Sequence, residues 1–143
     1  MGHRVREQWV FGGYDTTDKV GFLVPVERRN AETLLPIIEQ YIRPQTEIHS
    51  DLWRAYGGIQ ALPEGYKHLT VNHSLNFVDP ITYACTNHVE NMWKNAKISH
   101  KARCGTHRTL LPSYLQEFMW RQWFGEHPFR NIIEQITQIY TFA

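Results

Sequence analysis

Two separated segments carry side chains that could bind a divalent metal ion. Asp51 ends the first, His49-Ser50-Asp51, and Asn87 and Glu90 lie in the second, far downstream. Carboxylate oxygens are the ligands that Mg²⁺ prefers, and paired metal ions can clamp the attacking and leaving oxygens of a phosphodiester. Asp51 and Glu90 therefore predict a metal site, and the leading hypothesis for function is chemistry on nucleic-acid strands.

The second segment has the spacing of a helix. Polar residues recur there at i, i+3, i+4, i+7 and i+10, which is one helical face. They are Asn87, Glu90, Asn91, Lys94 and Lys97. Such a face could hold a metal ion and a phosphate together.

Both acidic positions also have structural interpretations. Asp51 could cap a short helix that begins at Leu52. Asn87 and Glu90 have the spacing of a capping box, in which two residues satisfy each other's orphan amides. The catalytic and structural interpretations are compatible, because a carboxylate in the first turn of a helix is held in place while one oxygen still faces a metal.

A base-rich stretch follows Glu90. No acid lies between Glu90 and Glu117, whereas the stretch contains Lys94, Lys97, Lys101, Arg103 and Arg108. A local basic surface is the electrostatic feature expected of phosphate contacts, so these bases are predicted to bind DNA. The alternative is a solvated helix face and loop without a partner.

Two cysteine-histidine pairs suggest a different class of function. Cys85-x-x-His88 and Cys104-x-x-His107 are separated by 15 residues, a spacing compatible with tetrahedral zinc. The alternative hypothesis is therefore a zinc-stabilised module for nucleic-acid binding or protein interaction.

The elements that must position these residues alternate between strands and helices, which predicts an α/β fold. Besides the helix after Asn87, the patterns predict strands at 8–14, 20–26, 46–50 and 68–73, helices at 30–42, 110–124 and 129–140, and a short helix after Asp51 that stops at Gly57-Gly58. In the last helix, the apolar spacing directs Ile132, Ile133, Ile136 and Tyr140 inward.

Asp15 lies in a predicted hairpin turn between the first two strands. A right-handed crossover through helix 30–42 makes strand 46–50 parallel to strand 20–26 and opposite to strand 8–14. Asp15 is therefore expected at the end of the sheet far from Asp51, and outside the site.

Composition sets the broad class. The 143 residues are 42% hydrophobic and 13% aromatic, which fits one folded domain over 1–143. No apolar run approaches the roughly 18 residues that span a bilayer, the N-terminus lacks the apolar stretch of a signal peptide, and the two cysteines do not make a disulfide framework. We expect an intracellular protein without membrane contact, cytoplasmic in a bacterium or nuclear in a eukaryote.

Six ordered motifs carry a family resemblance. They are Gln8-Trp9-Val10-Phe11-Gly12-Gly13, Thr33-Leu34-Leu35-Pro36-Ile37-Ile38, Ser50-Asp51-x-Trp53-Arg54-Ala55-Tyr56, Val71-Asn72-His73-Ser74-x-Asn76-Phe77-Val78-Asp79-Pro80, Thr86-Asn87-x-x-Glu90-x-x-Trp93 and Leu111-Pro112-Ser113-Tyr114-Leu115-x-Glu117-Phe118-Met119-Trp120-Arg121. Together, from about residue 8 to about residue 123, they resemble a DDE-type insertion-sequence transposase of the ISXO-type group, akin to Merlin elements.

The resemblance implies an RNase H-like mixed sheet flanked by helices, and DNA cleavage and strand transfer with Mg²⁺ or Mn²⁺. Asp51 then corresponds to the second catalytic aspartate, and Asn87 or Glu90 to the third acidic position. Lys97 matches a basic residue that contacts DNA. His73 and Asp79 lie in a loop that the family shares, where they are expected to support the metal ligands.

The resemblance also implies an N-terminal truncation. The family's first catalytic aspartate lies on a strand upstream of Gln8-Trp9, and this chain begins after that strand. We therefore expect a transposase-derived domain that is inactive as this chain alone. Without the missing strand, strands 8–14 and 46–50 either pair directly or keep unpaired edges, and open edges favour a homo-oligomer through the sheet edge or the helix around Trp120 and Trp123.

Overall fold

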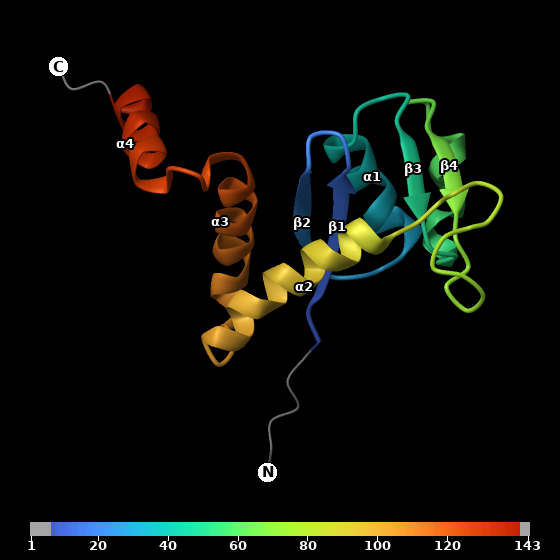
Figure 1. Ribbon diagram of the computed structural model, residues 1–143, viewed down its shortest axis with the longest axis horizontal. Helices are drawn as coiled ribbons and strands as arrows, with labels where there is room; N and C mark the ends of the chain where they lie inside the picture. The colour runs from blue at the N-terminus through green and yellow to red at the C-terminus, as the bar shows by residue number, and fades with distance from the viewer. Residues whose placement is uncertain (1–6, 141–143) are drawn as a thin grey trace, which may run out of the picture.

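The computed structural model describes residues 7–140 of the chain, and its element order confirms the α/β class (Figure 1). The start of the chain, on which the expected truncation depends, lies outside the described residues. The strands are β1 (Trp9–Asp15), β2 (Val20–Val26), β3 (Glu47–Ser50) and β4 (Lys67–Thr70). The helices are α1 (Ala31–Tyr41), the 3₁₀ helix η1 (Arg54–Ala61), α2 (Asn87–Ala102), the 3₁₀ turn η2 (Arg108–Leu110), α3 (Leu111–Phe124) and α4 (Pro128–Ile139).

The four strands form two small sheets. β1 and β2 pair antiparallel in a hairpin, with Trp9 opposite Val26 and Asp15 opposite Val20. The Asp15 carboxylate accepts hydrogen bonds from the N–H groups of Thr17 and Asp18, which fixes the predicted turn. β3 and β4 pair in parallel through the crossover that η1 provides.

α1 joins the two sheets. The side chain of Asn30 caps its N-terminus by accepting from the N–H of Thr33. On the buried side of the helix, Leu34 packs with Val26 of the hairpin, whereas Ile38 packs with Ile59 of η1. One amphipathic helix thus contributes to the core beneath both sheets.

α2 crosses the opposite face of the hairpin (Figure 1). Its buried residues Met92 and Ala96 pack with Leu23 of β2 and Leu115 of α3. Gly21 permits the close approach of α2, since a Cβ there would meet the Met92 sulfur and lie 2.6 Å from the Gly13 carbonyl oxygen. The polar face predicted for α2 remains exposed.

A single mixed sheet, as expected for the chain, is not formed by residues 7–140. β1 pairs with β2 only and β3 with β4 only, so β1 and β3 have no hydrogen-bonded pairing between them. Figure 1 shows them next to each other in opposite directions, in the order β2, β1, β3, β4. Of the two alternatives for these strands, the structure has the one with unpaired edges.

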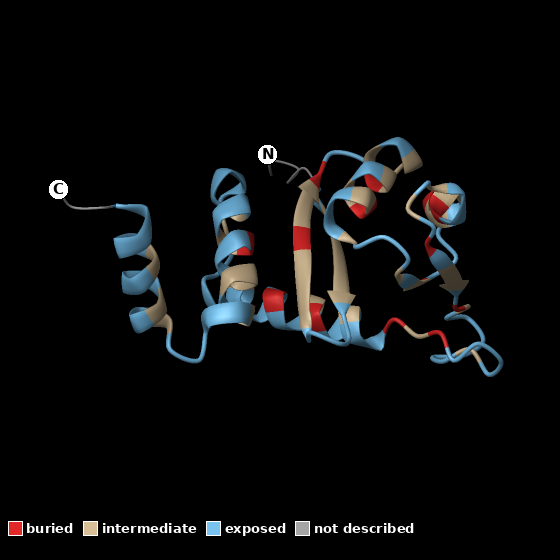
Figure 2. Ribbon diagram, turned by 90° about the horizontal axis from the view of Figure 1, so that it is seen from above, coloured by how far each residue is buried: buried red, intermediate tan, exposed pale blue. Residues whose placement is uncertain are grey.

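Two predictions about helices were wrong. η1 continues through Gly57 and Gly58 to Ala61, because neither glycine adopts the positive φ with which a glycine commonly ends a helix. α4 was expected to direct an isoleucine face inward, yet none of its residues is buried, and Ile132 and Ile133 are 46% and 45% exposed. Figure 2 shows α4 beyond α3 with largely exposed residues, because no described element covers its apolar face.

Candidate functional site

Asp51 directly follows β3 and is exposed. One carboxylate oxygen, Oδ1, accepts a hydrogen bond of 2.9 Å from the N–H of Trp53, so the side chain closes the turn after the strand. No hydrogen bond within residues 7–140 uses the other oxygen, Oδ2. The interpretation of Asp51 as the cap of a helix that begins at Leu52 is wrong, because η1 begins at Arg54, its N-cap residue is Trp53, and Asp51 instead orders the turn before it.

Trp53 connects this turn to the hairpin. Its indole N–H donates to the carbonyl oxygen of Arg29 at 2.9 Å. The Arg29 guanidinium lies over the ring of Trp53, at 4.5 Å from the centroid, and over the ring of Trp9, at 3.8 Å. Such cation–π contacts stabilise by roughly 0.5–1 kcal/mol each at exposed positions. The stack of Trp9, Arg29 and Trp53 therefore holds the Asp51 turn against the start of β1.

The Asp51 charge acts on a neighbouring phenol. Burial and the negative charge of Asp51 raise the pKa of Tyr56 to about 12. Tyr56 therefore stays protonated over the physiological range and cannot serve as a base there.

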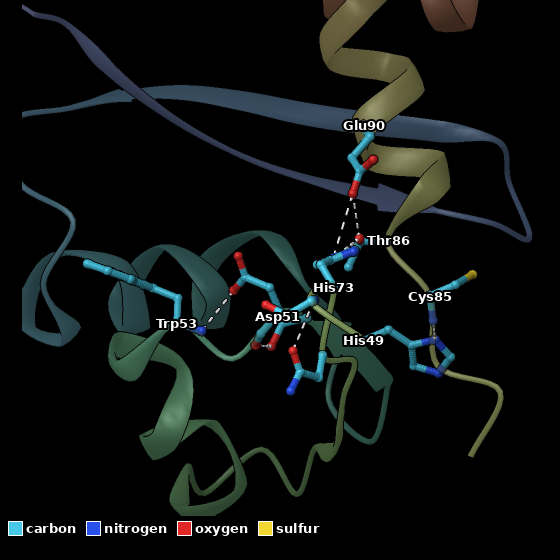
Figure 3. Close-up of polar contacts among 10 residues, drawn as sticks. His49, Asp51, Trp53, His73, Cys85, Thr86 and Glu90 are labelled. Atoms are coloured by element: carbon cyan, nitrogen blue, oxygen red, sulfur yellow. Dashed lines mark hydrogen bonds and ion pairs between the residues drawn. The ribbon is translucent and has the colours of Figure 1, made fainter. Parts of the chain in front are cut away.

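Glu90 lies in the first turn of α2, where its side chain is held by Thr86 and His73 (Figure 3). The Thr86 hydroxyl donates to Glu90 Oε1 at 2.8 Å and contacts His73 Nε2 at 2.7 Å. His73 Nε2 is 3.7 Å from the same carboxylate oxygen. Because the hydroxyl proton points to Glu90, Nε2 of His73 must carry the proton that it donates to Thr86.

This arrangement corrects the predicted capping box. The N-cap residue of α2 is Thr86, and Asn87 is the first helical residue. Asn87 is exposed and makes no hydrogen bond through its side chain to other residues between 7 and 140. Of the two candidates for the third acidic position, only Glu90 is therefore positioned by neighbouring side chains.

Asp51 and Glu90 each retain one carboxylate oxygen that Trp53 and Thr86 do not occupy. Figure 3 shows the two residues on separate elements, with His73 between them in that view. Their oxygens fit the preference of Mg²⁺ or Mn²⁺ for hard ligands. Within residues 7–140, however, no three His, Cys, Asp or Glu side chains gather closely enough to hold a metal ion. Asp51 and Glu90 are thus suitable ligands for Mg²⁺ or Mn²⁺, but the described residues add no third ligand of these types to the pair.

The loop between β4 and α2 borders the site. The Oδ1 atom of Asp79 accepts from the N–H groups of Thr82 and Ile81, and these bonds lower the pKa of Asp79. The N–H of Cys85 donates to Nδ1 of His49 at 3.4 Å, which ties the end of the loop to β3. Asp79 therefore orders the loop and is not directed at Asp51 or Glu90 by any hydrogen bond in the described structure.

The five bases predicted to bind DNA are exposed, and they fall into two groups. Lys94, Lys97 and Lys101 share the exposed side of α2. Arg103 lies over the ring of Tyr114 at 3.9 Å, and Arg108 donates to Gln8 and is 3.6 Å from a Glu27 oxygen. The lysines are thus the bases with the fewest internal contacts.

The zinc interpretation is not supported by the arrangement of its four residues. Cys85 and His88 lie at the start of α2, whereas Cys104 and His107 follow its end. A helix of 16 residues spans about 24 Å, far more than one tetrahedral site. A single-chain site of Cys85, His88, Cys104 and His107 is therefore excluded.

Sequence reasoning missed the roles of Thr86 and Arg29. Thr86 stands just before the predicted helix, a position that favours an N-cap residue, but its side chain makes no capping hydrogen bond, so this signal indicates its place and not its contacts with Glu90 and His73. Nothing in the spacing indicated that Arg29 stacks between two tryptophans, because the three residues come from three separate segments.

None of the helices between residues 7 and 140 has the length and apolar character needed to cross a bilayer.

A known protein family and one known protein are similar to the part of this chain that contains the candidate site. The sequence-family model of the ISXO2-like transposase domain matches residues 3–122, a range that includes all of the candidate site and ends within α3. An uncharacterized transposase-like protein of Haemophilus influenzae is 29% identical over 118 residues, which cover 82% of this chain and 91% of that protein. No solved structure matches the chain significantly.

Proposed function

Because the chain belongs to the ISXO2-like transposase family, we propose that it acts on DNA, with Asp51 and Glu90 as the metal-binding carboxylates of a DDE-type site. The observation that supports this most directly is the hydrogen-bonded arrangement of Thr86, His73 and Glu90, which holds one acid at the start of α2, while the contact between Cys85 and His49 ties the residues before α2 to β3, the strand that Asp51 follows. The strand order of Figure 1 is compatible with an RNase H-like sheet that lacks one strand between β1 and β3.

The proposed roles follow from the contacts. Asp51 Oδ2 and Glu90 Oε2 are the oxygens available to Mg²⁺ or Mn²⁺, and the bound ions would activate the attacking oxygen and stabilise the leaving one. Thr86 and His73 hold Glu90, and Trp53 holds Asp51. Since residues 7–140 bring no third ligand of these types to the pair, we propose that the site is catalytically incomplete in this form.

Contact with DNA is proposed for the exposed bases that follow Glu90. Lys94 and Lys97 continue the face of α2 that carries Glu90, one and two turns further along the helix. A phosphodiester near Glu90 would therefore place adjacent phosphates along these lysines. Lys101, Arg103 and Arg108 extend the same basic stretch, and a homo-oligomer remains the assembly that we propose for a transposase-derived domain.

The experiment is a nicking assay on DNA with the ends of the corresponding element, in Mg²⁺ and in Mn²⁺. The purified chain is expected to show no metal-dependent cleavage. Addition of an N-terminal strand with an aspartate is expected to increase Mn²⁺ affinity, and Asp51→Asn in that extended protein should remove the gain. Strong nicking by the unmodified chain that Asp51→Ala abolishes would disprove the proposed incompleteness. An extended protein whose Mn²⁺ binding ignores Asp51 and Glu90 would disprove the site.

A further inference from the structure

The apolar side of α4 is uncovered. Large apolar side chains recur along the helix and at its C-cap within about 120° of the helix circumference, which makes one stripe. This stripe, called the α4 face below, consists of Phe129, Ile132, Ile133, Ile136, Ile139 and Tyr140, whose exposed fractions range from 40% to 79%. None of the six belongs to a cluster of buried residues in the described part of the chain, so the α4 face is open to a partner.

α4 contacts α3 through a different side (Figure 2). The Nδ2 group of Asn131 donates to the carbonyl oxygen of Phe124 at 2.9 Å, and Oε1 of Gln135 accepts from the indole N–H of Trp120 at 2.8 Å. Asn131 and Gln135 are four residues apart and half-buried, so they mark the side of α4 that faces α3. Successive helical residues differ by about 100°, so Ile136 lies roughly a quarter turn from Gln135. Polar contacts thus hold α4 on α3 and leave the α4 face free.

The α4 face is large for a single chain. Free large apolar residues present roughly 150–250 Å² each, so at their exposed fractions the six residues present about 600 Å² together. The largest apolar patch on a monomeric protein is typically about 300–600 Å², and such patches often bind a partner. Two α4 faces in contact would bury about 1,200 Å², the lower end of specific protein–protein interfaces. The α4 face is therefore large enough to hold a second copy of itself.

The charges of α4 argue against a lipid surface or DNA as the partner. Arg130 and Glu134 are the charged residues of the helix, and Arg130 Nε lies 2.8 Å from Glu134 Oε1. The helix therefore has no net charge. A helix that lies on a membrane is rich in Lys and Arg on its polar side, and DNA requires an excess of bases. A neutral helix with one charge of each sign instead fits another protein surface.

The order of these two charges makes α4 complementary to itself. A two-fold axis across the helix reverses the direction of the second copy and brings the same border of both helices together. With the axis between Ile132 and Ile133, Arg130 comes next to Glu134 of the partner subunit, and the contact occurs twice. A parallel pair would place the Arg130 border against the opposite border, which holds Gln135 and no charge. Charge complementarity therefore favours the antiparallel pair.

We propose that α4 is a dimerisation helix, which packs antiparallel through the α4 face on the same face of a second copy of this chain. The apolar side chains form the centre of the interface, and two ion pairs between Arg130 and Glu134 of the partner subunit form its border. The proposal gives an interface to the homo-oligomer proposed above. It does not depend on the DNA chemistry, because α4 carries none of the proposed metal or DNA contacts and lies beyond residues 3–122, which match the family.

Sedimentation equilibrium of the full chain tests the apolar centre. Ile133→Glu places one charge of each copy beside the two-fold axis, where like charges repel, and should raise the dissociation constant at least about thirtyfold. Ile81→Glu is the matched control, because Ile81 is exposed in the loop before α2, and the same substitution there should change the constant by less than about twofold. Circular dichroism should show an unchanged fold, since no residue of α4 is buried.

Two charge variants test the antiparallel order. Arg130→Glu gives the border of each copy two acids, and Glu134→Arg gives it two bases, so each variant alone should dimerise more weakly than the unmodified chain. When the two variants are mixed in equal amounts, acids meet bases across the interface. Native mass spectrometry should then show at least about three quarters of all dimers as mixed dimers, against about half for random pairing.

Three results would overturn the proposal. The unmodified chain could stay monomeric at high micromolar concentration, which would assign the α4 face to another partner. Ile133→Glu could dimerise as tightly as Ile81→Glu, which would place the interface elsewhere. The two charge variants could pair at random, which would exclude the antiparallel order. The nicking assay measures the DNA chemistry separately, so either proposal can fail alone.

Discussion

Replacing Thr86 with valine tests whether the buried hydroxyl organises the site. Thr86 is only 9% exposed, and its hydroxyl joins Glu90 and His73 at 2.8 and 2.7 Å. Thr86→Val keeps the shape of the side chain and removes both hydrogen bonds. The carboxylate and the imidazole would then face each other directly, with no donor or acceptor between them.

The magnitude follows from burial. A hydrogen bond to a charged group contributes about 1.5–3 kcal/mol and one between neutral groups about 0.5–1.5 kcal/mol. The side chain of Glu90 is 56% exposed and that of His73 33%, so water replaces part of each lost bond. We therefore expect a loss of about 1–2 kcal/mol in the free energy of unfolding, or roughly 4 °C in Tm for a chain of this length.

A double-mutant cycle that combines Thr86→Val with Glu90→Ala measures the hydrogen bond between Thr86 and Glu90 itself. The other effects of each single substitution cancel in the cycle. Urea unfolding followed by circular dichroism supplies the four free energies, and the expected coupling is about 0.5–1.5 kcal/mol. Thr70→Val is the control, since Thr70 is exposed in β4 and should change stability by no more than about 0.5 kcal/mol. A coupling near zero, or equal effects of Thr86→Val and Thr70→Val, would refute the role assigned to Thr86.

Two further predictions concern charge. The logarithm of DNA affinity should fall with the logarithm of the salt concentration, with a slope of about 0.9 per phosphate contact. The double variant Lys97→Ala, Lys101→Ala should flatten this slope, whereas the control Lys19→Ala, Lys67→Ala, on other surfaces, should not. Equal slopes for the two double variants in filter binding would show that Lys97 and Lys101 do not contact DNA. Burial lowers the pKa of His68, whose Nε2 lies 2.8 Å from Ser50 Oγ, below its ordinary 6.5. Because the pKa of His68 is lowered in the folded state, the contribution of the neutral His68 to stability is present above pH 6.5 and is lost as the pH falls through the folded-state pKa. Below pH 6.5 the melting temperature of His68→Gln should therefore decline less steeply than that of the unchanged protein. Identical pH profiles would contradict this.

The sequence predicted local structure well where neighbouring residues decide it. The hairpin was correct because Asp15 and the residues after it form their own turn, and α2 was correct because its apolar and polar faces are separate. α4 has an equally clear apolar spacing, yet Ile132 and Ile133 are exposed, since spacing cannot say which element covers a face. The unpaired edges of β1 and β3 were one of two alternatives, because pairing depends on the whole sheet.

The two acids of the candidate site stay a prediction, whereas the side chains that hold them became visible only in the structure. Asp51 and Glu90 stand out by residue type, and the structure places the first directly after β3 and the second in the first turn of α2. The contacts of His73 with Thr86 and of Arg29 with Trp53 join residues that are well separated in the sequence and meet only in the folded chain. Such tertiary contacts leave no period in the sequence, so the supporting residues could not be found from spacing.

The separation of the two sheets bears on the relation between the two acids. Asp51 is carried by the sheet of β3 and β4, whereas Glu90 is carried by α2, which packs on the hairpin. No main-chain pairing joins these two halves within residues 7–140, so their relation depends on α1, the Arg29 stack and the contact between His49 and Cys85. A few side-chain contacts open at a lower free-energy cost than a ladder of main-chain hydrogen bonds between strands. The separation of Asp51 and Glu90, and with it the geometry available to a metal ion, therefore depends on packing and side-chain contacts and not on a ladder of paired strands.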